Sequence, residues 1–279
     1  MHVWDTVAIV GVGLIGGSIG LGLRSRGLAQ EVVGIGWREA SLRQAKRMGA
    51  VTRTTLDMAR GVAKADLVVV CTPVEQVVPT IRQADAACRH GTVITDAGST
   101  KSDIVTDLAD LRNARFVGGH PLAGSEKRGP QAAMADLFEG RVTVVTPTRD
   151  TDADALAAVE RLWSGLGSRV VRMTHQAHDA ALADTSHLPH VAASALALAT
   201  PRELLPLVAG GWSDTPRVAA GEGALWRQIL LSNRRNVARA LSRYEKTVAR
   251  FRRALADDDA AALEALLMEA KRIRDAVGS

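Results

Sequence analysis

The chain has 279 residues, which is long for one hydrophobic core and predicts two domains. Apolar residues make up 47% of it and charged residues 23%, as in soluble globular proteins, and the longest apolar runs are far too short to cross a bilayer, so we expect no membrane partner. The net charge is +5, yet there is one tyrosine and the basic residues are dispersed outside residues 234–253, so we expect no nucleic-acid partner.

The chain starts without the features of a secretory leader. Residues 1–5 run directly into a predicted strand, with no charged and then apolar segment before it. The two cysteines, Cys71 and Cys88, offer neither a disulfide framework nor a metal-ligand spacing. We therefore expect a cytoplasmic protein.

A glycine-rich turn follows the first predicted strand, residues 5–10. The pattern G-x-G-x-x-G is weak evidence alone, but here it stands between a strand and a segment of helical periodicity, residues 19–24. In that setting the first glycine makes a tight turn, the second lets the backbone reach a pyrophosphate, and the third packs the helix on the strand. A merely tight strand–helix junction is the alternative. The predicted cofactor-binding residues here are Gly11, Gly13, Leu14, Ile15 and Gly16.

The end of the second predicted strand, residues 31–35, bears on the choice of cofactor. An NAD site expects an acidic residue here to hold the ribose 2′-hydroxyl, but Gly36-Trp37-Arg38 stands in its place. Arg38 can bind a 2′-phosphate and Trp37 can cover the adenine, which favours NADP. NAD stays possible because Glu39 is close by, and Arg38 could simply point to solvent.

Further apolar strands alternate with helical segments. The strands are predicted at residues 67–71, 93–95, 115–117, 142–145 and 169–172, with a helix over residues 152–166. This alternation predicts an α/β domain of Rossmann type, with a mostly parallel sheet covered on both faces. Ligands bind beyond the carboxyl ends of such strands, so Thr72, Pro73 and the loop that holds Ser99 should line the cofactor site.

Glycines flank a histidine in the stretch Gly118-Gly119-His120-Pro121-Leu122-Ala123-Gly124. It follows a strand end, so His120 should stand where the sheet opens into a loop. Pro121 and the small residues after it would hold the imidazole in a fixed position. The alternative is a surface loop whose histidine satisfies only local hydrogen bonds.

After Thr174 the sequence becomes helical and rich in alanine, which places a domain boundary between residues 1–173 and 174–279. Pro189 inside the first long helix would cost about 3 kcal/mol, and such broken rules beside polar residues tend to mark sites. The spacing puts several residues on one helix face: Asp179, Ala183, His187, His190 and Ser194. The histidines lack a convincing carboxylate or cysteine set, so we expect no metal.

A loop punctuated by glycine and proline leads to Arg217, a possible clamp for a carboxylate, with a salt bridge to Asp214 as the alternative. Two long helices are predicted at residues 224–251 and 259–277. The basic residues of the first predict a solvated helix face, with attraction of an anionic substrate as the milder functional interpretation. The apolar faces of both exceed what one small domain needs, which predicts a homodimer through the helical domain.

Taken together, these motifs resemble the prephenate/arogenate dehydrogenase family, the cyclohexadienyl dehydrogenases of tyrosine biosynthesis. The resemblance covers nearly the whole chain in the family's order. The matching motifs are residues 11–18, 96–101, 120–126, 178–179, 186–190, 210–214 and Arg217. The resemblance implies a Rossmann domain, an all-α dimerisation domain, and NAD(P)-dependent oxidative decarboxylation of a cyclohexadienyl acid.

The resemblance also implies roles for individual residues. His120 would take the proton of the substrate's ring hydroxyl as hydride leaves, which suits a neutral imidazole with an ordinary pKa of about 6.5. Ser99 would bridge the hydroxyl, His120 and the cofactor. His190 and Arg217 would contact substrate carboxylates. The other implied substrate-binding residues are Ser125, Glu126 and Ser213, and the implied supporting network is Asp179, His187 and Asp214.

One position departs from the family pattern. Some members carry a lysine or arginine where Ser213 stands, so the preference for prephenate or arogenate stays open. Two other classes of protein share parts of this pattern. Another Rossmann-plus-helical dehydrogenase, of the β-hydroxyacid dehydrogenase or imine reductase type, usually needs a catalytic lysine in the helical domain or lacks the His120 loop. A non-catalytic NADP-binding sensor would bind cofactor without turnover.

Overall fold

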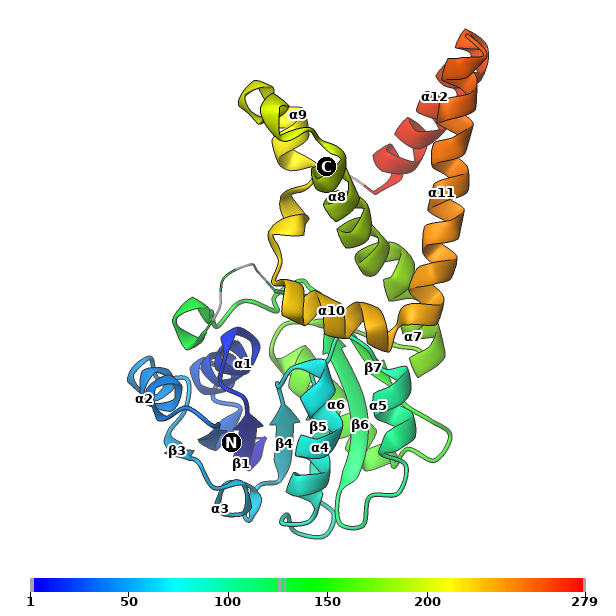
Figure 1. Ribbon diagram of the computed structural model, residues 1–279. Helices are drawn as coiled ribbons and strands as arrows, with labels where there is room; N and C mark the ends of the chain where they lie inside the picture. Colours follow the sequence, from blue (N-terminus) through cyan, green and yellow to red (C-terminus); the bar gives the residue numbers. More distant parts are fainter. Residues whose placement is uncertain (1–2, 125–126, 128, 278–279) are drawn as a thin grey trace.

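The computed structural model describes residues 3–124, 127 and 129–277. Its first half is built on one eight-stranded sheet with the order β3-β2-β1-β4-β5-β6-β7-β8 (Figure 1). Every neighbouring pair is parallel except β6 and β7, which run antiparallel. The strands are β1 Trp4–Val10, β2 Ala29–Ile35, β3 Arg53–Thr55, β4 Leu67–Val70, β5 Val93–Asp96, β6 Arg115–Pro121, β7 Val142–Thr146 and β8 Arg169–Arg172.

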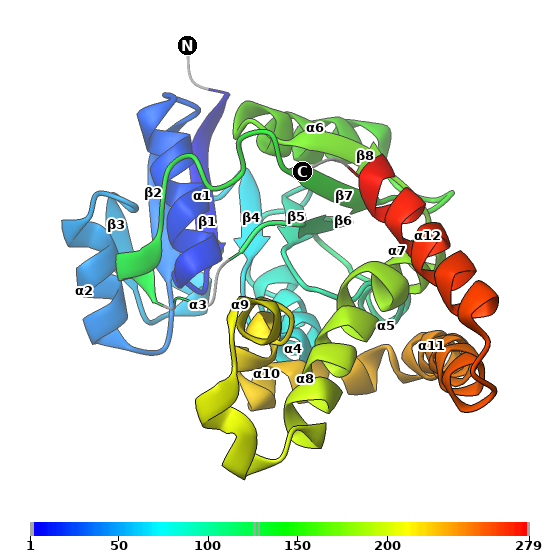
Figure 2. The same cartoon turned by 90° about the horizontal axis from the view of Figure 1, so that it is seen from above.

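Helices cover both faces of the sheet, as Figure 2 shows from above. They are α1 Leu14–Ser25, α2 Glu39–Arg47, α3 Met58–Val62, α4 Val74–Asp85, α5 Ser102–Asp107 and α6 Ala153–Gly165, with a short 3₁₀ turn, η1, at Pro130–Ala132. The central strands β4 and β5 are buried on both faces because each face meets a helical layer. The predicted Rossmann-type sheet is therefore confirmed.

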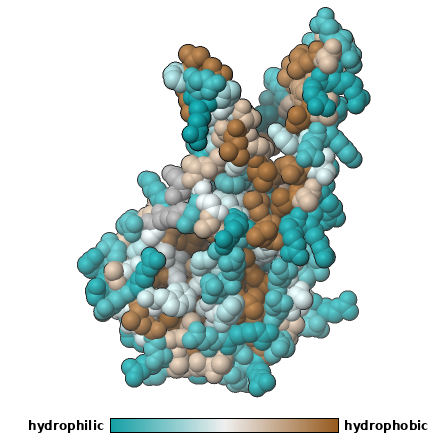
Figure 3. Space-filling view, viewed as in Figure 1, coloured by the Kyte–Doolittle hydropathy of each residue, from teal (hydrophilic) through white to brown (hydrophobic). Residues whose placement is uncertain are grey.

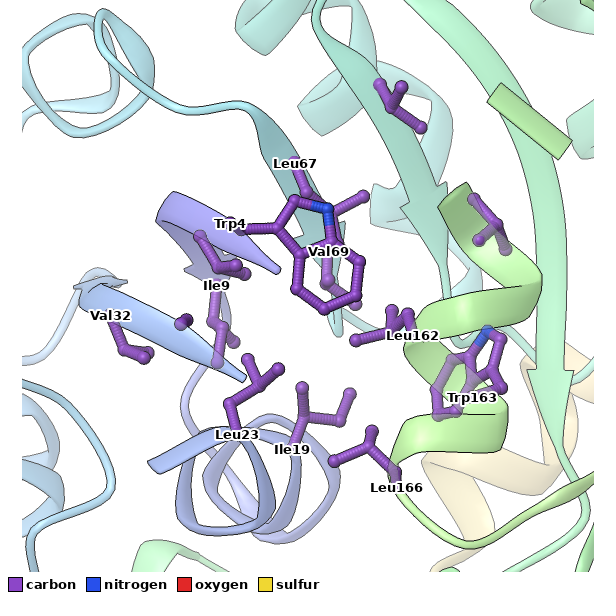
Figure 4. Packing of buried hydrophobic residues seen from close by; sticks show 14 of the residues in the cluster. Trp4, Ile9, Ile19, Leu23, Val32, Leu67, Val69, Leu162, Trp163 and Leu166 are labelled. Carbon is purple, nitrogen blue, oxygen red and sulfur yellow. The ribbon is translucent and has the colours of Figure 1, made fainter. Parts of the chain in front are cut away.

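Two hydrophobic cores hold these layers together. One lies between the sheet and α1, α2 and α6, where Ile9, Ile19, Leu162 and Trp163 are fully buried (Figure 4). The other lies on the opposite face beneath α3, α4 and α5. The edge where strand order reverses, between β1 and β4, is thus fixed from both sides, and ligands of such sheets bind at that edge.

The second half is entirely helical and rises from the sheet as two arms (Figure 1). Helices α8 and α9 lie in one arm, and α11 and α12 form the other, while α10 crosses beneath them along the upper edge of the sheet. Its elements are α7 His175–Leu182, a π turn (η2) at Ala183–His187, α8 Leu188–Ala199, η3 Arg202–Leu207, α9 Gly210–Asp214, η4 Arg217–Ala220, α10 Gly223–Ser232, α11 Arg234–Ala256 and α12 Ala260–Ala276.

One predicted helix was wrong. Residues 224–251 do not form a single helix, because the chain leaves helical geometry at Asn233 between α10 and α11. The side chain of Asn233 is buried and donates a hydrogen bond to the Asp179 carbonyl at 2.7 Å. The break turns α11 away from α10 and into its own arm.

Among residues 3–124, 127 and 129–277, no helix is long and apolar enough to cross a membrane.

Candidate functional site

The glycine-rich loop has the shape that a dinucleotide's pyrophosphate needs. Gly11 has a φ of 92°, and a Cβ there would lie 2.8 Å from the Cys71 carbonyl oxygen. A Cβ on Gly16 would lie 2.1 Å from the Gly11 oxygen, whereas one on Gly13 would meet no described atom within 4 Å. The loop is therefore closed towards the protein and open over Gly13.

Helix α1 begins directly after this opening, at Leu14. The first N–H groups of a helix lack partners within it, and they carry the positive end of the helix dipole. Leu14, Ile15 and Gly16 bring no negative charge to the first turn. The residues present fit a bound diphosphate, which a helix N-terminus of this kind holds.

The outer end of the same edge carries the residues expected to contact the adenosine part of a cofactor. Trp37 is 64% exposed and Arg38 is exposed at the start of α2. Glu39 is engaged by Arg43, with 3.0 Å between Arg43 Nη1 and Glu39 Oε1. On the inner side, Thr72 N lies 3.4 Å from the position of a Cβ on Gly11. Thr72 is buried, and Pro73 precedes α4.

His120 lies at the end of β6 and faces a second histidine. It is 9% exposed, and its Nδ1 lies 2.8 Å from Nε2 of His178 on α7. Nδ1 of His178 lies 2.8 Å from Asp179 Oδ1. Asp179 in turn accepts the backbone N–H groups of Lys101 and Ser102, both at 2.8 Å. One hydrogen-bonded row thus joins the sheet half to the helical half.

Burial sets the protonation states in this row. It lowers the pKa of His120 well below its ordinary value, and the neighbouring His178, Lys101 and His187 lower it further. Burial also lowers the pKa of His178, against the pull of Asp179. Burial alone would raise the pKa of Asp179, but hydrogen bonds from His178, Ser102 and Lys101 outweigh it and hold that pKa at about 2. At neutral pH the row contains two neutral imidazoles and a carboxylate.

A buried ion pair fixes the loop beside His120. Lys101 Nζ contacts Asp96 Oδ2, and both side chains are fully buried. Asp96 also accepts the N–H of Gly98 at 2.8 Å and that of Gly119 at 3.1 Å. The Ser99 side chain is half-buried in the loop between these residues. The ion pair therefore holds the Ser99 loop and the strand end that carries His120 in one arrangement.

The helical half places its own histidines against an indole. The His190 ring stacks on Trp226, with centroids 3.6 Å apart and planes 8° apart. His187 Nδ1 lies 3.1 Å from Asn233 Nδ2. A pocket of about 450 Å³ opens between α8 and α10. It is lined by His190, Val191, Ser194, Trp226, Arg227 and Leu230, among others.

The predicted clamp residues lie farther out. Ser213, Asp214 and Arg217 are all exposed, and η4, which begins at Arg217, packs against α8, the helix that carries His190. No ion pair between Arg217 and Asp214 occurs among the described residues. Ser125 and Glu126 lie outside the described residues.

Several residues of this arrangement were missed by sequence reasoning. Lys101 and Asp96 lie within a motif that was recognised without roles for these two side chains, and Trp226 and Asn233 stood in a segment interpreted as plain helix. His178 had one signal, its position next to Asp179 in a motif, but nothing in the spacing indicated that it faces His120. Within residues 3–124, 127 and 129–277, no three His, Cys, Asp or Glu side chains are grouped as metal ligands.

Fold and site together define a dinucleotide-binding oxidoreductase with an appended helical domain. Residues 19–172 match the nucleotide-binding domain of prephenate dehydrogenase, and residues 174–269 match its dimerization domain. The chain therefore belongs to the prephenate dehydrogenase family, as its motifs predicted.

Individual relatives agree with this membership. The chain is 34% identical to a prephenate dehydrogenase of Bacillus subtilis, over 97% of this chain and 76% of the relative. A crystal structure of prephenate dehydrogenase from A. aeolicus, in complex with hydroxyphenyl propionate and NAD+, is 31% identical, with a TM-score of 0.91 and 98% of each chain covered. A Synechocystis arogenate dehydrogenase is 28% identical, with a TM-score of 0.84, over 98% of this chain and 99% of that one.

Proposed function

We propose that this chain catalyses the NAD(P)-dependent oxidative decarboxylation of prephenate, arogenate or both, with His120 as the base. The observation that carries the proposal is a neutral, buried imidazole at a strand end, held by the His178–Asp179 pair. That strand belongs to the sheet that carries the dinucleotide loop, and its carboxyl end contacts the helical half through His178.

The chemistry divides between the cofactor and the side chains. When bound, the oxidised nicotinamide accepts the hydride from the ring carbon that bears the hydroxyl. His120 takes the hydroxyl proton as that carbon becomes a carbonyl, and general-base catalysis of this kind contributes about 10²–10⁴-fold. Ser99 bridges the hydroxyl and His120, a role that its half-buried place beside the Asp96–Lys101 pair supports.

Decarboxylation then returns the proton. The bond to the ring carboxylate breaks, its electron pair makes the ring aromatic, and carbon dioxide leaves. The ring oxygen becomes a phenol by taking back the proton that His120 holds. No net proton is produced, so the base needs no path to solvent.

In this proposal Arg217 and His190 bind the substrate carboxylates. Ser125, Glu126 and Ser213 surround the substrate's side chain. Asp179, His187 and Asp214 support them. The stacking of His190 on Trp226 supports its part, because it fixes the imidazole beside the pocket between α8 and α10. Ser213 brings no charge to the side chain, and so it favours neither substrate.

NADP is the favoured cofactor. Arg38 offers a guanidinium at the end of β2, and the carboxylate of Glu39 is engaged by Arg43 rather than left to a ribose. Gly11, Gly13, Leu14, Ile15 and Gly16 hold the diphosphate, while Trp37, Thr72 and Pro73 line the rest of the site. NAD remains the other candidate, since the A. aeolicus relative was crystallised with NAD+.

The working form is a cytoplasmic homodimer that pairs through residues 174–279, with residues 1–173 as the nucleotide-binding half. The end of β8 at Arg172 and the start of α7 at His175 support that division. The match to a dimerization domain supports the pairing, and the two unpaired cysteines suit a reducing compartment.

The test is an assay of reduced-nicotinamide formation with the four combinations of prephenate or arogenate and NAD or NADP. We expect turnover with NADP at a lower KM than with NAD. His120→Asn should lower kcat by about 10²–10⁴-fold with cofactor affinity unchanged, because only proton removal is lost. Arg217→Ala should chiefly raise KM, by about 10-fold or more, because a charge-assisted carboxylate contact is lost.

Three outcomes would each contradict one part of the proposal. Turnover of neither acid would overturn the function, and full turnover by both variants would overturn the residue roles. A lower KM for NAD than for NADP would overturn the cofactor preference alone.

A further inference from the structure

In the hydrogen-bonded row behind His120, Asp179 determines which atom of each pair donates and which accepts. Its Oδ1 faces both the Lys101 N–H and His178 Nδ1, and its Oδ2 accepts the Ser102 N–H. Backbone N–H groups can only donate, so this carboxyl must accept from them. Held ionised, it has no proton to offer. The atom that faces it from His178 must therefore be an N–H, which places the His178 proton on Nδ1.

The same reasoning carries one residue further. A neutral imidazole has one N–H, and burial keeps His178 neutral. Its Nε2 is then a bare acceptor, 2.8 Å from His120 Nδ1. A contact of that length between two acceptors would be repulsive, so Nδ1 of His120 must carry its proton. The remaining nitrogen of the neutral His120, Nε2, is left with its lone pair.

We propose that His178, oriented by Asp179, is a positioning residue that fixes His120 in the Nδ1–H tautomer and so makes Nε2 the proton-accepting atom. The catalytic role of His178 rests on the proposed function, whereas the tautomer assignment rests on the geometry alone. When His120 holds the substrate proton, its Nδ1–H donates more strongly to His178, and Asp179 stabilises the charge through that ring. Asp179 thus acts on the imidazolium without contacting substrate.

The burial of the His120–His178–Asp179 row is consistent with a substrate proton that stays in the site. His178 is 0% exposed and Asp179 is 2% exposed, so neither opens a path to solvent. The charged and titratable groups facing His120 are His178 and Asp179 on α7, Lys101 before α5, and His187 in the π turn. Those facing His178 are Asp179, Lys101 and Asp96. Each is held by its own partner in the structure, and Asp179 alone directs the His178 ring.

The tautomers can be observed without substrate. The chain has seven histidines, so two-bond ¹H–¹⁵N correlation spectra of ¹⁵N-histidine-labelled protein can be assigned with single His→Gln variants. At neutral pH we expect His120 and His178 both to carry the proton on Nδ1. In His178→Leu the preference of His120 should be lost, with signals of both tautomers. A wild type whose His120 carries the proton on Nε2 would overturn the proposal.

Activity gives the second measurement. His178→Leu should lower kcat by about 10²-fold with KM and cofactor Kd unchanged, as expected when a base sits in the wrong tautomer. His178→Gln, whose amide oxygen can accept from His120 Nδ1, should recover at least about a tenth of wild-type kcat. His175→Gln, on the same helix, is the matched control and should keep full kcat.

The outcomes separate this role from others. Equal kcat losses in the Leu and Gln variants, or less than threefold loss in His178→Leu, would overturn the positioning role. Absence of turnover in the wild type would overturn the proposed function instead, while the spectra would still decide the tautomer.

Discussion

Gly13 and Gly16 are three residues apart in one loop, and a side chain added to each would meet opposite surroundings. A Cβ on Gly16 would lie 2.1 Å from a backbone oxygen of the same loop, whereas one on Gly13 would meet no described atom within 4 Å. Gly13 also has a φ of −84°, which any residue can adopt. One glycine is thus required by the fold, and the other leaves room where a ligand is expected.

This difference predicts opposite phenotypes for two identical substitutions. Gly13→Ala should keep its thermal midpoint but weaken NADP binding by about 10-fold or more, because the methyl group occupies the approach of the diphosphate. Gly16→Ala should lower the free energy of unfolding by about 1–3 kcal/mol, because the backbone oxygen cannot move aside. Calorimetric titration and chemical unfolding measure the two effects. Unchanged NADP affinity in Gly13→Ala would place the diphosphate elsewhere.

At the scale of elements, the segment from α7 through the π turn to α8 concentrates buried, neutral histidines. His178, His187 and His190 are each at most 7% exposed. Pro189 is the second residue of α8, which begins immediately after the wider turn of Ala183–His187. A π turn accommodates a proline that an uninterrupted α-helix would exclude, because the lost N–H falls at its junction. The predicted cost of Pro189 is therefore relieved locally.

Neutral burial makes this segment sensitive to acid. Burial lowers the pKa of His187 from 6.5 to about 4. The folded state binds a proton at His187 less readily than the unfolded state does. The contribution of neutral His187 to the free energy of unfolding is therefore complete above pH 6.5 and is lost as pH falls towards 4. Between pH 7 and pH 5 we expect a loss of about 2 kcal/mol from His187 alone. Urea unfolding at both pH values measures it.

His187→Gln is the control for that measurement. The variant should lose less stability than wild type between pH 7 and pH 5, by about the same 2 kcal/mol, because its amide does not titrate. His120, His178 and His190 would still contribute, since burial lowers the pKa of each. Identical pH dependence in the two proteins would contradict the neutral burial of His187.

Elements that local sequence determines could be predicted, whereas elements that depend on contacts between distant residues could not. The strand, glycine turn and helix at residues 5–24 were predictable because the residue types there suit the local backbone geometry. The predicted Rossmann-type fold is confirmed. The break at Asn233 was not predictable, since the residues around it keep helical periodicity and its cause is a contact with Asp179, far away in sequence. The three-residue strand β3 pairs only at the sheet edge, which leaves too short a pattern to recognise.

The candidate site follows the same division. His120 was predictable as a polar residue at a strand end between glycines. Its partner His178 lies 58 residues away, and the contact arises only when α7 packs beside α5 and β7. Local sequence therefore pointed to His120 as a candidate, while its contact with His178 depends on how the two halves dock.

At the scale of the whole molecule, apolar surface is unevenly shared between the halves. Of the twenty-one exposed large hydrophobic side chains among the described residues, sixteen lie beyond residue 195. Figure 3 shows apolar side chains gathered where α8 meets α10, at the base of the gap between the arms. We expect another apolar surface to cover a helical domain built this way, and the proposed homodimer would supply one by two-fold symmetry.

Two leucines with matched exposure test this view. Leu267 on α12 is 56% exposed and Leu56 on the sheet half is 58% exposed. By light scattering after size exclusion, we expect wild type at twice the 29.5 kDa of one chain. Leu267→Lys should dissociate at a higher concentration than wild type, since a buried ammonium in an interface without a partner is costly. Leu56→Lys should associate like wild type, because Leu56 faces solvent in both monomer and dimer.

A monomeric wild type at micromolar concentration would exclude the dimer. Equal weakening by both variants would mean that added charge, rather than a covered helical face, controls association.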